Sequence, residues 1–311
     1  MNNETTHPQH VHQHTKSCNV LMLYLDNLAP SGRRSMRSLL QQVAMMQGWS
    51  GELELMPWMT LRYEHIAGIR ATLRHSNKSP NTINTTLAAL RGVLKAGFLS
   101  GQFPALEWQR IQAIDRIAGK TFPAGRQLSS TEINRLFTAC ERDPVNGIRD
   151  AAILTLLAYA GLRRSELTSL NIADYETRTG VLIVREGKGQ RQREMSLPMA
   201  ARPTLRRWLH CRGNQPGALF CQLAKNGEYN PEQRITAHRV YGILADRAKQ
   251  AGIAHCSPHD LRRTFVTRLL EQGVDFNTAS QLAGHENIHT TALYDRRHVK
   301  AQRQAMAKFG Y

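Results

Sequence analysis

The segment that most constrains the fold of this chain is a nearly continuous apolar run over residues 151–162. A run of this length is too short to span a bilayer, which takes about 20 apolar residues. It also lacks the polar face that a surface helix presents to water. The run therefore predicts a long buried helix over residues 148–160, at the centre of a domain that must be built around it.

The pattern of the 311-residue chain predicts two domains joined by a linker. Apolar residues recur at helical spacing over residues 18–117 without any strand pattern, which predicts four or five short helices around one core. Residues 118–127 combine glycine, proline and basic residues and predict the linker. Residues 128–311 add strand signals to helical ones. We therefore expect a mainly α protein with a small β-hairpin or sheet in the second domain, preceded by a flexible His-rich tail over residues 1–17.

Turn and stop signals locate the elements of the second domain. A β-branched run, a glycine-containing turn over residues 186–190 and a polar-alternating run predict a β-hairpin that ends near residue 198. A helix over residues 259–272 follows a proline and stops at a glycine. A shorter helix over residues 276–283 also stops at a glycine. These signals place Lys188 at the hairpin turn, and His259 and Arg262 near the start of the longer helix.

Charge and cysteine content narrow the class of function. The chain has 41 lysines and arginines against 24 aspartates and glutamates, a net charge of +17. Both the first 125 residues and the remainder are basic, which favours a polyanion bound across folded domains over a basic protein that is merely soluble. The five cysteines are scattered without a CxxC pair, and the N-terminus lacks the apolar core of a signal peptide. We expect a reduced, cytoplasmic protein that binds no membrane.

Two basic residues of the second domain occupy positions where phosphate chemistry is feasible. Arg163 directly follows the buried helix and a glycine. A guanidinium held rigidly at such a point suits bidentate binding of phosphate, although an ordinary surface arginine fits the same pattern. Lys188 lies between glycines at the predicted hairpin turn, where it is either a solvated lysine or a proton donor delivered into a DNA groove.

Further candidates lie near the C-terminus. His259 and Arg262 share one helix face through their i, i+3 spacing. Near a helix N-terminus that face also offers free N–H groups to an anion, although a capped, satisfied histidine is an equal alternative. His285 follows a glycine, and Tyr294 lies nine residues further on. Each of these signals is weak when it is taken alone.

In this order and spacing, the Arg, Lys, His-x-x-Arg, Gly-His and Tyr signals resemble the tyrosine recombinase family, which includes phage-type integrases and Xer-type recombinases. The flanking segments AYAGLRRSEL, GKGQRQR, SPHDLRRTFVT and LAGHENIHTTALYDR are similar to that family's motifs. The resemblance covers most of residues 128–298. Residues 18–117, with SPNTINTTLAALRGVLKAG, resemble the family's helical, SAM-like core-binding domain. The resemblance implies a clamp in which two domains enclose duplex DNA.

The resemblance also implies which basic groups bind the scissile phosphate. Arg163 and Arg262 hold that phosphate, and Glu166 orients the arginine region. Arg164 and Arg263 lie beside the two arginines, but they do not hold the family's spacing. Two fixed guanidiniums form a preorganised site for the charge that gathers on the phosphate oxygens in the transition state.

The remaining roles follow from the same resemblance. Tyr294 attacks the phosphate, giving a 3′-phosphotyrosine and a free 5′ hydroxyl. His259 binds the phosphate or accepts the tyrosine proton, and Lys188 protonates the departing 5′ oxygen. His285 supports the phosphate. A tyrosine with a pKa of about 10 needs such an acceptor or a strong positive field, because it is protonated at neutral pH.

We expect no cofactor and no metal, because the motifs lack an Asp/Glu cluster and two arginines can replace metal ions. The family acts as a tetramer on two recombination sites in double-stranded DNA, with or without accessory DNA-bending proteins. We expect no arm-binding domain before residue 18. The amphipathic tail over residues 301–311 docks into a neighbouring subunit or folds back on its own domain, and both alternatives stay open.

Two other functions compete with site-specific recombination. A type IB topoisomerase-like enzyme would use similar chemistry to relax supercoils as a monomer, but the compact helical N-terminal domain argues against it. A catalytically idle DNA-binding protein is opposed by the intact set of candidate residues. The pattern does not separate integration and excision from inversion or dimer resolution.

Overall fold

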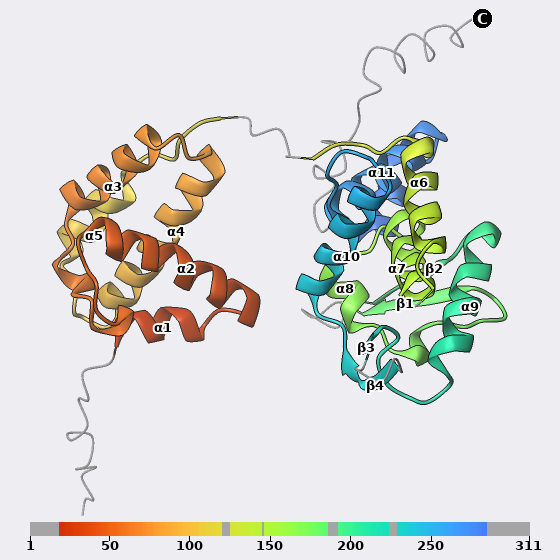
Figure 1. Cartoon of the computed structure of the whole chain (residues 1–311). Coiled ribbons are helices and arrows are strands. Elements are labelled where there is room, and N and C mark those ends of the chain that lie inside the picture. The colour runs from red at the N-terminus through yellow and green to blue at the C-terminus, as the bar shows by residue number, and fades with distance from the viewer. Residues whose placement is uncertain (1–18, 120–124, 145, 186–191, 224–228, 285–311) are drawn as a thin grey trace, which may run out of the picture. The chain divides into compact units, whose positions relative to one another are not determined.

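The computed structural model divides into two compact units, Met1–Phe122 and Pro123–Tyr311, which we describe separately (Figure 1). The predicted His-rich tail over residues 1–17 and the predicted tail over residues 301–311 lie outside the described residues. Within the two units, the structure describes residues 19–119, 125–144, 146–185, 192–223 and 229–284.

The first unit is all-helical in its described part, as its pattern predicts. The long helix α4 contacts each of the other four α-helices and forms the centre of the core. Its start is set by Ser79, whose hydroxyl accepts the backbone N–H of Thr82, and by Pro80 at the first helical position. The helices are α1 (Val20–Asp26), α2 (Pro30–Met46), α3 (Tyr63–His75), α4 (Pro80–Leu99) and α5 (Ala105–Gln112), with 3-10 turns η1 (Leu53–Leu55) and η2 (Trp58–Thr60).

The second unit contains helices and two small antiparallel sheets. Its helices are α6 (Ser130–Glu141), α7 (Gly147–Tyr159), α8 (Arg164–Ser169), α9 (Arg202–Arg212), α10 (Ala237–Gln250), α11 (Pro258–Glu271) and α12 (Phe276–Ala283), with 3-10 turns η3 (Ile172–Asp174) and η4 (Met199–Ala201). Its strands are β1 (Val181–Arg185), β2 (Gln192–Ser196), β3 (Cys221–Leu223) and β4 (Tyr229–Arg234), and β1 pairs with β2 and β3 with β4.

Helix α7 is the central element of the second unit, as its apolar sequence predicts. It contacts α6, α8, α9, α10 and α11, so neighbours surround it (Figure 1). Ile153, Leu156 and Leu157 have no exposed surface. A helix buried on so many sides is a rigid support, and the chain leaves it at Gly161 to enter the region of the candidate site.

The expected β-hairpin is also present. β1 pairs with β2 from Val181 opposite Ser196 to Arg185 opposite Gln192. No sequence pattern predicted α9, α10 or the β3–β4 pair. β4 has the sequence YNPEQR, which lacks apolar alternation and contains a proline, so periodicity could not identify it.

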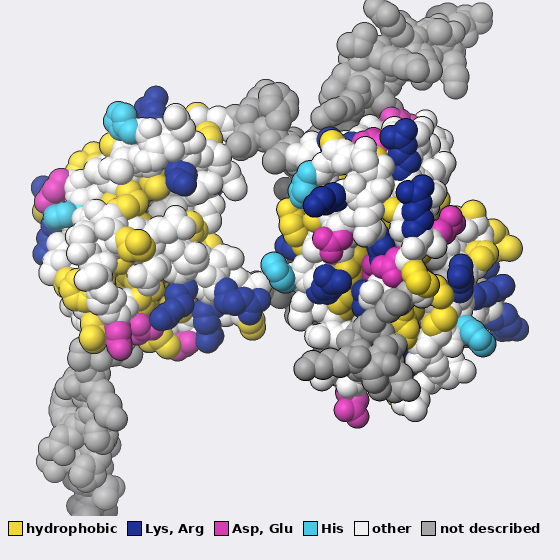
Figure 2. Space-filling view, in the orientation of Figure 1, with side chains coloured by type: hydrophobic (Ala, Val, Ile, Leu, Met, Phe, Trp, Pro, Cys, Tyr) yellow, Lys and Arg dark blue, Asp and Glu magenta, His cyan; other side chains and the backbone are white. Residues whose placement is uncertain are grey.

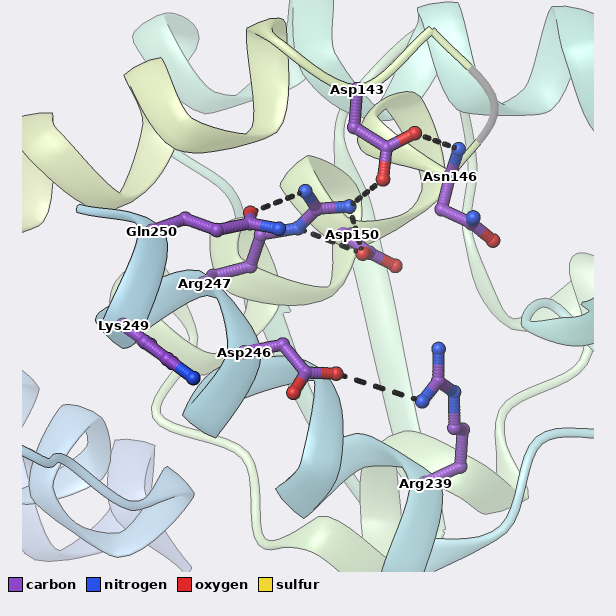
Figure 3. Close-up of a pocket in the computed structure, with 8 residues that line it drawn as sticks. All are labelled: Asp143, Asn146, Asp150, Arg239, Asp246, Arg247, Lys249 and Gln250. Carbon is purple, nitrogen blue, oxygen red and sulfur yellow. Dashed lines mark hydrogen bonds and ion pairs between the residues drawn. The ribbon is translucent and has the colours of Figure 1, made fainter.

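A buried ionic network joins α7 to α10 (Figure 3). Arg247, which is 3% exposed, donates to Asp150 at 2.5 Å and to Asp143 at 2.6 Å. Arg149 donates to the other oxygen of Asp150 at 2.9 Å. The network borders an open cavity of about 490 Å³. Because these buried charges pair with one another, we interpret the network as a structural link between helices.

Candidate active site

Arg163 lies between the end of α7 and the start of α8. Its backbone N–H donates to Glu166 Oε2 at 2.8 Å, and its guanidinium donates to Glu166 Oε1 at 2.6 Å. The same guanidinium donates to the carbonyl of Gly284, the C-cap of α12. The Arg163 side chain is 38% exposed. It is therefore oriented by protein groups while part of it still faces solvent.

Glu166 also binds Arg193 on β2, a residue that no sequence motif marked as part of the site. Arg193 Nη1 and Nη2 donate to the two carboxylate oxygens at 3.1 and 2.7 Å. Burial favours the protonated carboxyl, but hydrogen bonds and positive charges from Arg193 and Arg163 outweigh it and hold the pKa of Glu166 below its ordinary value. The ionised carboxylate thereby links α8 to the β-hairpin.

Arg262 reaches the same region from α11. It is 3% exposed, and its Nη1 donates to the carbonyl of Gly161 at 2.7 Å. Gly161 has a φ of +58°, and a Cβ at this position would lie 2.3 Å from the ring of Phe265. A glycine is therefore needed both for the backbone conformation and for the close approach of α11. Arg262 thus contacts the short loop that carries Arg163.

The adjacent arginines make different contacts. The guanidinium of Arg164 lies 5.8 Å from the ring centroid of Tyr241. Arg263 is buried and donates to the carbonyl of Gly125. Neither contact involves the loop on which Arg163 and Arg262 converge.

His259 lies in the first turn of α11, next to a capping box formed by Ser257 and Asp260. Its side chain is partly open to solvent. Desolvation by the surrounding protein and the positive charges of Arg262 and Arg263 together lower the pKa of His259, although Asp260 opposes them. The ring is therefore neutral near pH 7 and can accept a proton or a hydrogen bond.

Two described segments that contact this cluster are adjacent in sequence to further candidate residues. Gly284, whose carbonyl meets Arg163, directly precedes His285. Strand β2, which is bound to Glu166, begins four residues after Lys188. The described chain therefore contacts the cluster at Gly284, one residue before His285, and at Arg193, five residues after Lys188.

The described structure thus gathers four of the predicted site residues around the start of α8 and the start of α11. These four are Arg163, Glu166, His259 and Arg262. The other three lie outside the described residues, and they are Lys188, His285 and Tyr294.

Two cysteines of the second unit have strongly perturbed thiols. Burial raises the pKa of Cys140 to about 12 and that of Cys256 to about 11, so neither thiol is suited to act as a nucleophile. Residues 19–284, apart from the gaps given above, contain no group of three or more His, Cys, Asp or Glu side chains placed to hold a metal ion. No helix in the described part of the chain is long and apolar enough to cross a membrane.

Comparison with known proteins identifies the family. Residues 126–302, more than half of the chain, match the model of the phage integrase family. The chain belongs to this family of tyrosine recombinases. Over 274 residues this recombinase is 30% identical to tyrosine recombinase XerC of Vibrio parahaemolyticus, covering 87% of this chain and 84% of the relative. It is also 30% identical over 238 residues to tyrosine recombinase XerA of Pyrococcus furiosus, covering 76% and 77% of the two proteins.

Solved structures share the fold of the recombinase. The Tn1549 transposon integrase in complex with transposon right end DNA matches with a TM-score of 0.66 at 20% identity, over 94% of this chain and 99% of that one. A lambda integrase dimer bound to a COC′ core site matches with a TM-score of 0.66 at 16% identity, over 89% and 95% of the two proteins. At these identities the matches support the architecture of the chain.

Proposed function

We propose that this site-specific recombinase cleaves and rejoins DNA with Tyr294 as its nucleophile, through a 3′-phosphotyrosine intermediate. One observation carries the proposal: Arg262, on α11, donates to the carbonyl of Gly161 in the short loop that carries Arg163. The loop begins at the end of the buried helix α7, so the two arginines have a rigid support. Such an arrangement suits one phosphodiester.

The arginines would stabilise the charge that develops on the non-bridging oxygens. One preorganised donor of this kind typically lowers a barrier by about 2.7–4 kcal/mol. Glu166 accepts hydrogen bonds from Arg163 and thereby orients it. The separate contacts of Arg164 and Arg263 support Arg163 and Arg262 as the phosphate-binding pair.

Proton transfers complete the proposed reaction. His259, neutral because its pKa is lowered, binds the phosphate or accepts the proton of Tyr294. Lys188 protonates the 5′ oxygen as it departs, and His285 adds a further hydrogen bond to the phosphate. The phosphotyrosine bond retains the energy of the broken phosphodiester, so rejoining by the 5′ hydroxyl requires neither ATP nor a metal in this mechanism.

We assign residues 18–117 to a core-binding domain and residues 128–311 to a catalytic domain, joined by a linker over residues 118–127. Lysine and arginine side chains are exposed on both units (Figure 2). In the first unit Arg34 and Arg37 lie exposed on α2. These charges support a two-domain clamp on double-stranded DNA, held mainly by salt-sensitive phosphate contacts.

The assembly that we propose is a homotetramer on two recombination sites, because exchange between two duplexes requires four strand cuts. Accessory DNA-bending proteins are further candidate partners. We also propose that the recombinase acts in the cytoplasm. The free thiols of Cys140, Cys211, Cys221 and Cys256 support that compartment.

A trapping experiment tests the nucleophile. Nicked duplexes that carry a recombination site would be incubated with the protein and resolved on denaturing gels. We expect a covalent protein–DNA adduct with the wild type and none with Tyr294→Phe, while DNA affinity stays within about twofold because phosphate contacts dominate binding. An adduct that persists in Tyr294→Phe would show that another residue attacks.

A second arm separates the competing activities. Exchange of strands between two duplexes identifies recombination, whereas relaxation of supercoiled DNA without exchange identifies the topoisomerase-like alternative. Binding without either reaction identifies a catalytically idle protein.

A further inference from the structure

The described part of the second unit begins with a short segment, residues 125–128, that runs along α11. The carbonyl of Gly125 accepts a hydrogen bond from Arg263. The backbone N–H of Leu128 donates to Oγ1 of Thr264, the next residue of the same helix, at 2.9 Å. The segment is therefore fastened to the helix that carries His259 and Arg262.

Asp260 is the central connection between this segment and the helix. Its Oδ1 accepts the backbone N–H of Arg126 at 2.8 Å. Its Oδ2 accepts both the backbone N–H and the hydroxyl of Ser257, each at 2.8 Å. Asp260 is 5% exposed. One buried carboxylate therefore satisfies donors from the helix N-cap and from a segment 134 positions away in the sequence.

The packing at this connection leaves little space. Gly125 has a φ of +113°, and a Cβ at this position would lie 2.2 Å from Asp260 Oδ1. The backbone of the segment therefore lies directly against the carboxylate. A residue with a side chain would have to move either the segment or the first turn of α11.

We infer that Asp260 is a positioning residue of the active site. By joining the N-cap of α11 to residues 125–128, it fixes the start of that helix, from which His259 and Arg262 project. This inference rests on the proposed function, in which both residues act on the phosphate. Asp260 itself acts through them, because its two oxygens are occupied by protein donors.

The cost of losing this connection follows from the geometry of catalysis. Without the carboxylate, the donors of Ser257 and Arg126 lose their acceptor, and the first turn of α11 is no longer held to the segment. A displacement of about 1 Å in a group that aligns a reaction can cost on the order of 100-fold in rate. Binding of DNA, which depends on many phosphate contacts, should change far less.

The kinetic test uses full-length protein and nicked duplex sites. Asp260→Ala should lower the single-turnover rate of adduct formation on the order of 100-fold, with DNA affinity within about threefold of wild type. Asp260→Asn should recover part of that rate, because its amide oxygen still accepts a hydrogen bond. Asp275→Ala is the matched control, because it also removes one carboxylate, here the side chain that caps the N-terminus of α12. It should leave the rate within about threefold.

A spectroscopic test does not depend on catalysis. The imidazole ring-proton NMR resonances of His259, assigned by comparison with His259→Gln, should shift in Asp260→Ala and stay unchanged in Asp275→Ala. Thermal unfolding of each variant measures any general loss of stability.

The outcomes separate this inference from the proposed function. If the wild type forms no adduct, the proposed function is wrong, and the histidine resonances still test the positioning role. If adduct forms but Asp260→Ala cleaves at the wild-type rate, or loses no more rate than Asp275→Ala, the inference is overturned. An unshifted His259 resonance in Asp260→Ala also overturns it.

Discussion

At the scale of single residues, the candidate site depends on a few shared acceptors. The carboxylate of Glu166 binds both Arg163 and Arg193, and the carbonyl of Gly161 binds Arg262. Each guanidinium is thereby placed before any phosphate arrives, so little reorganisation is needed when the transition state forms.

The lowered pKa of His259 makes a prediction about pH. If the neutral ring is the active form, the rate of adduct formation should be retained as the pH falls to the ordinary histidine pKa of about 6.5. It should then decline below that value, as the ring becomes protonated. His259→Gln should be slower and should lack this decline. Single-turnover rates from about pH 5 to pH 8 measure both effects, and a wild-type decline centred above the ordinary pKa would contradict the prediction.

At the scale of elements, an ion pair between Arg193 and Glu166 joins the β-hairpin to α8, which begins directly after Arg163. Arg193, on β2, is 12% exposed and makes a bidentate contact to Glu166. Arg185, on the partner strand β1, is 59% exposed and pairs with Asp174. Arg193 therefore joins the hairpin to the candidate site, whereas Arg185 lies at the surface.

Replacing these two arginines should therefore have unequal effects on the protonation of the leaving 5′ oxygen by Lys188. Arg193→Ala should slow adduct formation at least tenfold, whereas Arg185→Ala should change it by less than about threefold, as expected for an exposed ion pair. A substrate whose bridging 5′ oxygen is replaced by sulfur should restore much of the Arg193→Ala rate, because a thiolate leaves without a proton donor. Equal losses on both substrates would show that Arg193 acts elsewhere.

The elements that the sequence predicted are those specified by local signals. The apolar run predicts α7, and the preceding proline and the following glycine predict α11. The contacts between elements were not predictable in this way. Arg193 meets Glu166 across 27 positions, and Arg126 meets Asp260 across 134. Helical or strand periodicity predicts neither contact, because such long-range pairs depend on how the elements pack against one another.

At the scale of the whole molecule, the basic charge of both units and the family membership favour a DNA-bound assembly. The predicted C-terminal tail, residues 301–311, offers a means of joining subunits. Its candidate anchors are Met306 and Phe309 on an amphipathic segment. Whether the tail acts on its own subunit or on a neighbour can be decided by measuring assembly separately from binding.

Deletion of residues 301–311 should spare binding of a single site and weaken cooperative assembly on paired sites. We expect a change in single-site affinity of less than about threefold, because phosphate contacts elsewhere supply most of the binding. Gel-shift titration and sedimentation of the complexes measure the two quantities. Met306→Asp with Phe309→Asp should reproduce the deletion, with Gln304→Asp as a control. Unchanged assembly would favour a tail folded back on its own domain.

The enclosure of α7 has a consequence for experiments in solution. Its amide hydrogens are shielded by helices on several sides, so they should exchange with deuterium only when the whole unit unfolds. Peptides from α7 can therefore serve as an internal reference in hydrogen-exchange mass spectrometry. Against that constant signal, protection that DNA confers on α8 and on the first turn of α11 can be quantified within a single sample.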